Sequence, residues 1–230
     1  MKLAVVILAA GASSRMGRPK LLLPWGGTTV LGHLLDQWRA LGASPIAIVC
    51  AAADPLLRGE LDRLGVPQAH RILNSDPERG MFSSIQCAAK WDSAQSDLSH
   101  WAIALGDQPH LRHETLRRLL EFAARHSEQV CQPSFHGHGR HPVILPAAVF
   151  TRLKDSPGAN LKEFLLTSAL LVARCEMDDA GLDLDLDEPS DYERALAVAG
   201  AESSTCNDQG PRDRVQRAES KAQRAESEIQ

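Results

Sequence analysis

Two cations follow closely on an apolar stretch near the start of the chain. Residues 3–10 are apolar at every position, which is typical of a parallel strand buried on both faces. The small residues 11–14 come next and would let backbone N–H groups approach a ligand. Arg15 then offers a planar fork of donors and Lys20 a point charge, which together suit an anion with several oxygens. The stretch predicts a strand that ends at a polyphosphate site.

Two common phosphate-binding patterns do not fit this stretch. A Walker A loop has four residues between its glycines and then Lys-Ser or Lys-Thr. Here five residues separate Gly11 from Gly17, and Arg18 follows. The dinucleotide fingerprint fails because no glycine follows Gly11 at the required spacing. A secretory signal peptide is the other interpretation, but its charged region would hold only Lys2 and the later cations would have no purpose.

Carboxylates that could hold a metal ion occur at two later points. Asp107 follows a buried-type strand at 101–105, in the sequence Gly-Asp-Gln-Pro. An Asp after a strand is commonly a turn residue or a helix cap. In a parallel sheet, however, this one would lie at the same edge as the two cations, where a triphosphate needs Mg²⁺. Further on, Asp183, Asp185 and Asp187 would share one face of an extended segment and repel unless water or a cation separates them.

Apolar runs and helical periodicity alternate along the chain. This order predicts an α/β fold with a mostly parallel sheet, right-handed crossovers and helices on its faces. Residues 1–200 would form one domain, and the polar residues 201–230 a disordered tail. Besides the first strand, we expect strands at 45–51, 70–74, 101–105 and 170–177, and helices at 30–41, 55–64, 80–91, 113–126, 160–167 and 190–199, the last of them capped by Ser190.

Three histidines lie close together in the segment 130–146. His136, His138 and His141 suggest zinc, but the two-residue alternation of a hairpin would put the first two on one face and the third on the other. We therefore favour a hairpin turned by glycine over a metal site.

Gly80, Ser83 and Ser84 begin the helix predicted at 80–91. Small hydroxyl residues at a helix start can cap the helix or contact a ligand, and the sequence alone leaves both roles open.

The composition excludes several classes of protein. With 230 residues, 43% hydrophobic and 23% charged, the chain has the make-up of a folded domain. A net charge of −4 gives no overall attraction to nucleic acid, and no apolar run reaches the roughly 18 residues of a membrane span. The five cysteines are widely spread without a C-x-x-C pair, which favours inert thiols in a reducing cytoplasm.

The stretch LAAGASSRMGRPKLLLPWGG resembles the motif of the molybdenum-cofactor nucleotidyltransferases, and its LAAG and RPK resemble the cytidylyltransferase branch in particular. The guanylyl branch usually has LAGG and an Asp before the Lys. The family's other motifs recur in GDQP at 106–109, in His-Pro-Val at 141–143 and in Leu-Asp-Leu-Asp at 184–187. Arg140 stands where glycine is usual and Glu188 where threonine is usual. The resemblance covers about residues 1–196 and implies a single Rossmann-like nucleotidyltransferase domain, with a β-hairpin insertion for the acceptor.

The resemblance also implies a set of site residues. Asp107 would bind the metal ion together with Asp185, with Asp183 and Asp187 as the other candidates for second ligand. The candidate catalytic residues are Arg15, Lys20 and Asp107. The nucleotide would contact Leu8, Ala9, Ala10, Gly11, Arg15, Lys20, Gly80, Ser83 and Ser84, and the acceptor Gln108, Pro109, His141 and Pro142.

The implied reaction transfers CMP from CTP to the phosphate of molybdopterin cofactor, with Mg²⁺ and release of pyrophosphate. No Ser-His or Cys-His pair is placed for covalent catalysis, so direct in-line attack on the α-phosphorus is the economical mechanism. A client molybdoenzyme is a possible partner. The alternatives are GMP or sugar-phosphate transfer on the same fold, a cofactor-binding insertion factor without turnover, and last a nicotinamide-dependent oxidoreductase, whose glycine fingerprint is missing.

Overall fold

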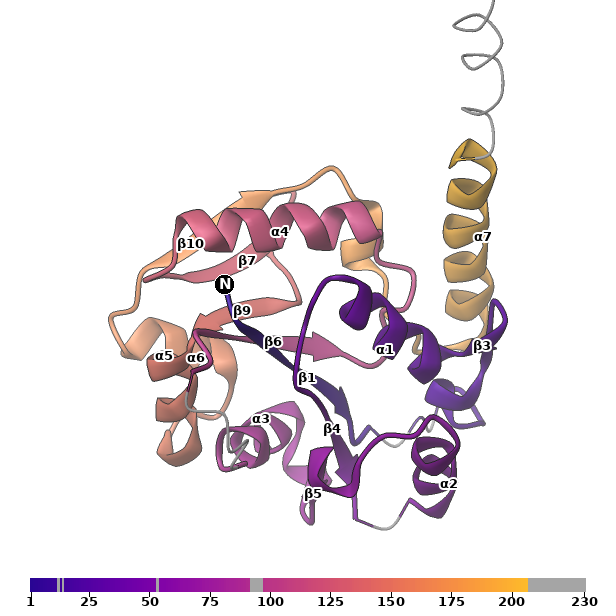
Figure 1. Cartoon of the computed structure of the whole chain (residues 1–230), viewed down its shortest axis with the longest axis horizontal. Helices are drawn as coiled ribbons and strands as arrows, with labels where there is room; N and C mark the ends of the chain where they lie inside the picture. Colours follow the sequence, from indigo (N-terminus) through magenta and orange to yellow (C-terminus); the bar gives the residue numbers. More distant parts are fainter. Residues whose placement is uncertain (12, 14, 53, 92–96, 207–230) are drawn as a thin grey trace, which may run out of the picture.

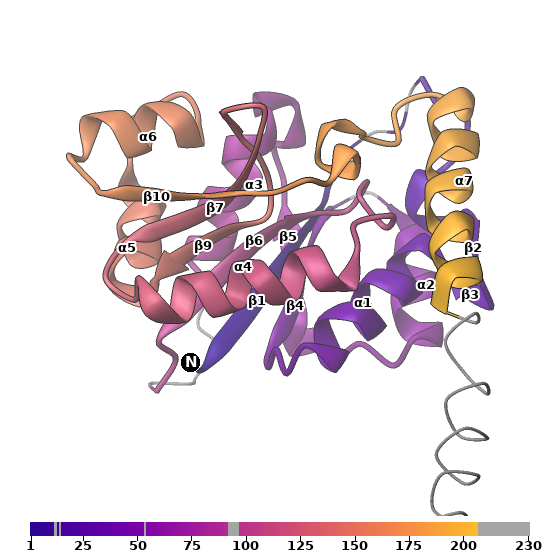
Figure 2. The same cartoon turned by 90° about the horizontal axis from the view of Figure 1, so that it is seen from above.

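A central sheet separates two layers of helices (Figures 1 and 2). The architecture comes from a computed structural model, which describes residues 1–11, 13, 15–52, 54–91 and 97–206, with the backbone alone from residue 201 on. Within these residues no helix is both long and apolar enough to cross a membrane. The fold is the mostly parallel, helix-flanked α/β fold that the sequence predicts.

The described part of the central sheet has eight strands in the order β10-β7-β9-β6-β1-β4-β5, with β8 paired to β7 (Figure 1). β1, β4, β5 and β6 run parallel to one another, and β10 runs parallel to β7. β9 is antiparallel to both of its neighbours. The strands are β1 (Leu3–Ala9), β4 (Ile46–Ala51), β5 (Arg71–Asn74), β6 (His100–Leu105), β7 (Val130–Phe135), β8 (His138–Gly139), β9 (Val143–Pro146) and β10 (Val172–Glu176).

The helices cover the sheet on both faces, as Figure 2 shows. One layer contains α1 (Val30–Ala40), α2 (Pro55–Arg63) and α4 (His113–Arg125). The other contains α3 (Met81–Ala89), α5 (Ala147–Arg152) and α6 (Leu161–Thr167). α7 (Pro189–Cys206) lies at one end of the molecule, beside the small sheet of β2 (Pro24–Trp25) and β3 (Thr28–Thr29) (Figure 1).

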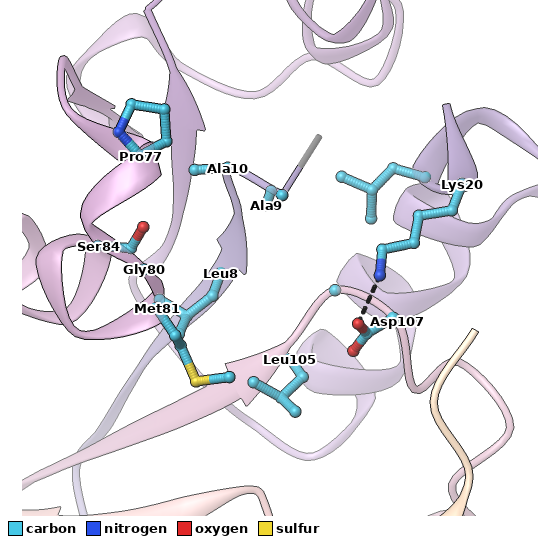
Figure 3. A pocket seen from close by; sticks show the side chains of 13 residues that line it. Leu8, Ala9, Ala10, Lys20, Pro77, Gly80, Met81, Ser84, Leu105 and Asp107 are labelled. Atoms are coloured by element: carbon cyan, nitrogen blue, oxygen red, sulfur yellow. Dashed lines mark hydrogen bonds and ion pairs between the residues drawn. The ribbon is translucent and has the colours of Figure 1, made fainter. Parts of the chain in front are cut away.

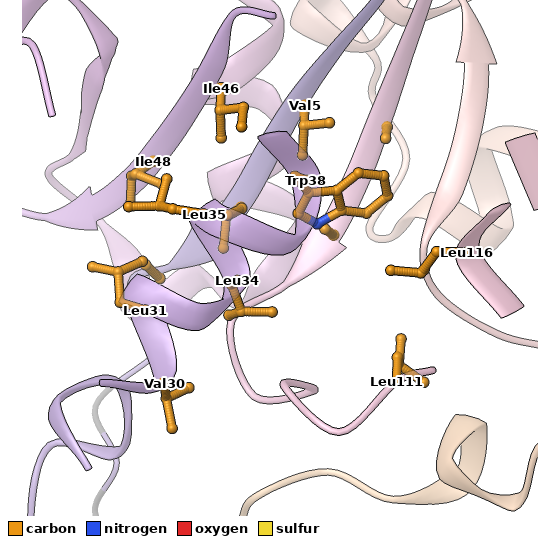
Figure 4. Packing of buried hydrophobic residues seen from close by; sticks show 14 of the residues in the cluster. Val5, Val30, Leu31, Leu34, Leu35, Trp38, Ile46, Ile48, Leu111 and Leu116 are labelled. Atoms are coloured by element: carbon orange, nitrogen blue, oxygen red, sulfur yellow. The ribbon is translucent and has the colours of Figure 1, made fainter. Parts of the chain in front are cut away.

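α1 shows how the sequence builds the core under the site. The Thr29 side chain caps the helix by accepting a hydrogen bond from the Gly32 N–H at 3.1 Å. Leu31, Leu35 and Trp38 follow at helical spacing and are at most 2% exposed. They face the sheet beside Val5, Ile46 and Ile48 (Figure 4). Burying one such side chain contributes about 1.5–3 kcal/mol, and the strands that end at the site are therefore held rigidly.

The predicted hairpin turned by glycine is present, but its paired residues span only 134–139 of the segment 130–146. Ser134 pairs with Gly139 and Phe135 with His138, and the turn places His136 and Gly137 at φ values of 51° and 76°. Two successive positive φ values match a two-residue turn of the primed type. The rest of the segment belongs to the central sheet, because β9 inserts between β6 and β7. The described residues contain no group of three or more His, Cys, Asp and Glu side chains able to hold a metal ion.

The C-terminal helix begins earlier than predicted and continues further. It starts at Pro189, a residue favoured in the first turn of a helix, so Ser190 lies inside the helix and the prediction of Ser190 as the cap is wrong. The Asp191 carboxylate instead accepts from the backbone N–H of Asp187 at 3.3 Å and of Glu188 at 3.0 Å. α7 then extends past Gly200 to Cys206, and residues 207–230 of the predicted tail lie outside the described residues.

Four of the five cysteines belong to the part of the chain whose side chains are described, and all four are free thiols. Cys50 and Cys131 are buried, and burial raises the pKa of each thiol to about 11. Cys87 and Cys175 are half-buried, and burial raises their pKa values as well. Thiols with raised pKa values are poor nucleophiles at neutral pH.

Candidate active site

A pocket of about 260 Å³ opens at the carboxyl ends of β1 and β6 (Figure 3). The end of β1 and the following loop form its floor through residues 8–11, and residues 105–107 come from the end of β6. Lys20 and Leu21 close one side. The opposite side comes from Pro77, Gly80, Met81 and Ser84, at the start of α3. Parallel sheets bind ligands at this edge because the loops after neighbouring strands converge there.

Gly106 is what allows the ends of β1 and β6 to come together. A Cβ atom at this position would lie 2.7 Å from the carbonyl oxygen of Leu8, closer than such atoms approach in proteins. The Gly106 N–H donates to that same oxygen at 3.0 Å. The glycine of the Gly-Asp-Gln-Pro sequence is therefore required by packing, and it places the next residue, Asp107, at the pocket wall.

Both predicted cations pair with carboxylates, and of these pairs the one between Lys20 and Asp107 lines the pocket. Lys20 Nζ lies 2.6 Å from Asp107 Oδ2, as Figure 3 shows, and 3.7 Å from Asp187 Oδ1. Arg15 Nη2 lies 2.8 Å from Asp187 Oδ2. The Lys20 side chain is 15% exposed, whereas that of Arg15 is 65% exposed. Lys20 is thus a fixed charge in the pocket wall, whereas Arg15 is an exposed side chain outside the pocket lining that is joined to Lys20 through Asp187.

Asp107 has one carboxylate oxygen engaged and one free. Oδ2 accepts from Lys20, while Oδ1 is buried and accepts no hydrogen bond from any described residue. Such an atom is costly unless water or a cation binds it. The Asp107 carbonyl oxygen also accepts from the Leu186 N–H at 3.1 Å, which attaches the segment that carries the other carboxylates.

The three aspartates after β10 alternate with buried leucines, but they meet different partners. Asp183 pairs with Arg140, and Asp187 with Arg15. Asp185 Oδ1 accepts from Gln108 Nε2 at 2.9 Å. Loss of surrounding water and the nearby Asp107 carboxylate raise the pKa of Asp185, because both oppose its negative charge.

The pair of Asp107 and Asp185 fits a divalent cation. One carboxylate has a buried oxygen without a partner, and the other is destabilised by the first. Oxygen ligands of this kind suit Mg²⁺, which is commonly held by one or two carboxylates while water and phosphate oxygens complete its shell. Asp183 and Asp187 pair with arginines, whereas Asp185 contacts the neutral Gln108 amide and lies near Asp107, so Asp185 stays our candidate for the second ligand.

The predicted acceptor residues are not part of the pocket wall. Gln108 is only 4% exposed and its amide is used on Asp185. Pro109 is buried, and Pro142 lines a separate small crevice beneath the site together with Gln108. His141 Nδ1 lies 3.3 Å from the carbonyl oxygen of Ile103, and burial lowers the pKa of its imidazole. In this structure these four residues therefore pack outside the pocket lining.

The two serines at the start of α3 also separate. Ser84 lines the pocket, whereas Ser83 is not among the lining residues and its hydroxyl is used on backbone carbonyl groups. Both serines contact Asn74, a buried residue that the sequence analysis included only as the end of a strand. A polar residue at the end of a buried strand was the signal that could have identified it.

A second set of residues that the sequence analysis missed attaches the aspartate segment to the Gly-Asp-Gln-Pro loop. Asp179, 3% exposed, accepts from Thr115 Oγ1 and from the Gly181 N–H and pairs with Arg112. His110, 2% exposed, contacts the Gly181 carbonyl oxygen through Nε2 at 2.9 Å. These contacts hold the aspartate segment through both the N–H and the carbonyl oxygen of Gly181, and they therefore help to fix the position of Asp185.

The protein has the α/β nucleotidyltransferase fold, a mostly parallel central sheet flanked by helices, with a pocket at the carboxyl ends of β1 and β6. The chain matches the MobA-like NTP transferase domain over residues 5–171, more than half of its length, and it belongs to that family. It is an NTP-dependent nucleotidyltransferase of the MobA-like family.

Relatives differ in the activities that their names state. The chain is 29% identical to the nicotine blue oxidoreductase of Paenarthrobacter nicotinovorans over 202 residues, which are 83% of this chain and 95% of that protein. It is 24% identical to the molybdenum cofactor cytidylyltransferase of Escherichia coli K12 over 188 residues, 81% of this chain and 92% of that protein. Among solved structures, Rv0371c from Mycobacterium tuberculosis H37Rv superposes with a TM-score of 0.70 at 27% identity, covering 86% of this chain and 98% of that one.

Proposed function

We propose that the protein transfers CMP from CTP to the phosphate of molybdenum cofactor and releases pyrophosphate. The observation that carries the proposal is the charge arrangement at one end of the pocket. Lys20 and Asp107 line the pocket, Arg15 is linked to Lys20 through Asp187, and Asp185 is near enough to Asp107 for the two negative charges to oppose each other. The LAAG and RPK sequences and the E. coli relative support cytidine as the base.

The ion pairs suggest how the site accepts its substrate. The charges of Lys20 and Arg15 are neutralised by Asp107 and Asp187. An arriving triphosphate offers both cations oxygens in place of the carboxylates, and Asp107 then becomes free to ligate the metal ion. Bound Mg²⁺ would neutralise charge on the phosphate oxygens. Substrate and metal should therefore bind more tightly together than either does alone.

Direct transfer suits the residues in the pocket. Its described walls contain no Ser-His or Cys-His pair, and the thiols are buried or half-buried away from it. An acceptor phosphate oxygen would therefore attack the α-phosphorus in line while pyrophosphate leaves. Lys20 and Arg15 would hold the leaving oxygens, where negative charge grows in the transition state.

The oxidoreductase name of one relative gives a rival proposal from another class. Against it, a fixed cation beside a carboxylate with a free oxygen serves a metal-bound phosphate better than it serves hydride transfer. The strand-to-helix glycine pattern of dinucleotide-binding enzymes is also missing. A cofactor-binding insertion factor would use the same pocket without turnover, and a GMP or sugar-phosphate transferase would differ only in the bound base or acceptor.

One experiment separates the nucleotidyltransferases from one another and from the other two alternatives. Purified protein is incubated with molybdenum cofactor, Mg²⁺ and each NTP in turn, and released pyrophosphate and the mass of the product are measured. We expect kcat/KM for CTP to exceed that for GTP by about 10²-fold or more. A guanylylated product in excess would move the protein to the other branch. In a parallel reaction, a sugar phosphate replaces the cofactor as the acceptor. Absence of pyrophosphate with every NTP and both acceptors would favour the insertion factor or the oxidoreductase.

A further inference from the structure

Asn74 occupies a buried position beside the pocket, at the end of β5. It is 1% exposed, and each polar group of its side chain is engaged. Nδ2 donates to Ser83 Oγ at 2.8 Å and to Ser84 Oγ at 3.0 Å. Oδ1 accepts from the Asp76 N–H at 2.9 Å. Because the Asp76 contact needs a carbonyl oxygen, the NH₂ group must face the two serines, and both hydroxyl groups must accept from it.

The two hydroxyl groups then differ in where their protons point. Ser83 Oγ lies 2.8 Å from the carbonyl oxygen of Gly80 and 3.2 Å from that of Asp76, so its proton is used inside the protein. Ser84 Oγ accepts from Asn74 and finds no acceptor for its own proton among the described residues. A hydroxyl has one proton to donate. Since Ser84 lines the pocket, that proton is available to a ligand.

The position of Ser84 shows which part of a nucleotide it would meet. Figure 3 shows Ser84 beside Pro77 and Gly80, on the side of the pocket opposite Lys20 and Asp107. If the triphosphate lies at the charged side, the nucleoside lies at the Ser84 side. The bound atom must be a hydrogen-bond acceptor, such as a carbonyl oxygen or ring nitrogen of the base or an oxygen of the ribose.

We propose that Asn74 is a positioning residue for nucleoside recognition, which fixes the Ser84 hydroxyl as a donor aimed into the pocket. This inference rests on the proposed function, since it takes the pocket ligand to be a nucleotide. Asn74 itself is buried and does not line the pocket. It acts through Ser84, and its second contact, with Ser83, holds the start of α3 in place at the same time.

The test uses two variants of the full chain and two probes. Ser84→Ala removes the donor. Asn74→Asp keeps the shape and the acceptor for Asp76, but its carboxylate can only accept, so the Ser84 proton turns away from the pocket. We expect each variant to raise the Kd of CMP or GMP, whichever the wild type binds more tightly, about tenfold. The double variant should bind no more weakly than either single variant, because both remove the same hydrogen bond.

Magnesium pyrophosphate is the second probe, because it occupies the charged side without a nucleoside. Its Kd should change less than about twofold in Ser84→Ala and Asn74→Asp, while Lys20→Ala should weaken it clearly. Ser83→Ala is the matched variant within α3, and we expect it to change the nucleotide Kd by less than about threefold. A collapsed helix start would instead weaken both probes and lower Tm.

Two results would overturn the proposal. One is wild-type nucleotide affinity in Ser84→Ala, a small substitution that the fold should tolerate. The other is a double variant whose loss is the product of the two single losses, which would show that Asn74 and Ser84 act independently. If the wild type binds pyrophosphate but neither nucleotide, the proposed function fails together with this inference. If the wild type binds a nucleotide, only the role of Asn74 and Ser84 is at stake.

Discussion

The parallel half of the sheet and the mixed half both send loops to the same edge, but they present different surfaces there. In the parallel half, β1 and β6 end in the pocket and the segment after β5 contributes Pro77 to it, and Lys20 and Asp107 line its charged side. The mixed half, with β7, β9 and β10, presents polar groups that are already paired or buried. Asp183 and Asp185, which follow β10, are used on Arg140 and Gln108.

Under the proposed function, this difference means that the nucleotide side would be preformed and the acceptor side would not. The nucleotide side needs only an exchange of ion partners to bind a charged ligand. The acceptor side would need Arg140, His141 or the Asp183 segment to give up contacts within the protein before they touched a second substrate.

The largest effect is expected on the nucleotide side, from Lys20→Ala. The variant removes a fixed charge that faces the leaving group, so kcat/KM should fall by about 10²-fold or more. Steady-state pyrophosphate release measures the loss, with Lys162→Ala on α6 as the control. The melting temperature should be recorded as well, because Asp107 loses its partner. Near-normal kcat/KM in Lys20→Ala would remove this residue from the mechanism.

Asp107→Asn tests the metal assignment on the same side. The amide keeps the shape of the side chain but removes the charge, so Mg²⁺ affinity and turnover should fall together, turnover by about tenfold or more. Calorimetry with Mg²⁺ and pyrophosphate measures the affinity. Asp36→Asn, at an exposed pair on α1, is the control. Activity that survives chelation by EDTA would contradict the two-carboxylate site.

The sequence predicted the residues of the pocket wall better than the residues packed around it, for a physical reason. Residues 3–10 and 101–105 are apolar throughout because buried parallel strands must be, and such runs reveal where the ends of strands converge. Asp107 follows the second of these strands closely, Lys20 lies after the loop that follows the first, and both were found from these positions. Asn74 was missed because its role depends on hydrogen bonds to α3, which no local pattern encodes.

The placement of the proposed acceptor residues was harder to predict because their contacts join segments far apart in the chain. β9 inserts between β6 and β7, and this places His141 and Pro142 beneath the site rather than at its wall. A pattern of alternating residues shows that a strand exists but not which neighbour it joins. The Ser190 cap was wrong for a simpler reason, because Pro189 already occupies the first turn of α7.

Arg140→Ala tests whether the Arg140–Asp183 pair shapes the acceptor side. The pair joins the end of the hairpin to the aspartate segment, and both side chains are partly exposed, so its contribution to stability is about 0–1 kcal/mol. We expect KM for the acceptor to rise about threefold to fivefold while KM for the NTP stays constant. Asp183→Asn should give the same result, and the double variant no more. Equal changes in both KM values would show that the pair supports the whole site instead.

Asp185→Asn should stabilise the fold while it impairs metal binding. The raised pKa means that the folded state opposes the ionised carboxylate of Asp185, mainly through loss of water and then through Asp107. This cost is fully present above the folded pKa and disappears as the pH falls below the unfolded pKa. The variant should therefore melt about 2 °C higher than the wild type at pH 7, with the difference vanishing toward pH 3.5. A lower melting temperature at pH 7 would mean that the Gln108 contact outweighs the repulsion.

The smallest effect is expected from ending the chain at Gly200. Among the side chains that the structure describes, those that dock α7 precede this point: Ala195 is fully buried, and Tyr192 packs on Trp25 at 6.2 Å and donates to the Pro24 carbonyl oxygen. Removing residues 201–230 removes almost no large apolar side chains, so Tm should stay within about 1 °C and kcat/KM within error. Ending the chain at Glu188 is the matched comparison, because it deletes the docked part of α7 and should lower Tm by several degrees, about 4 °C or more. If the Gly200 truncation costs as much as the Glu188 truncation, the tail stabilises the domain through contacts of its own.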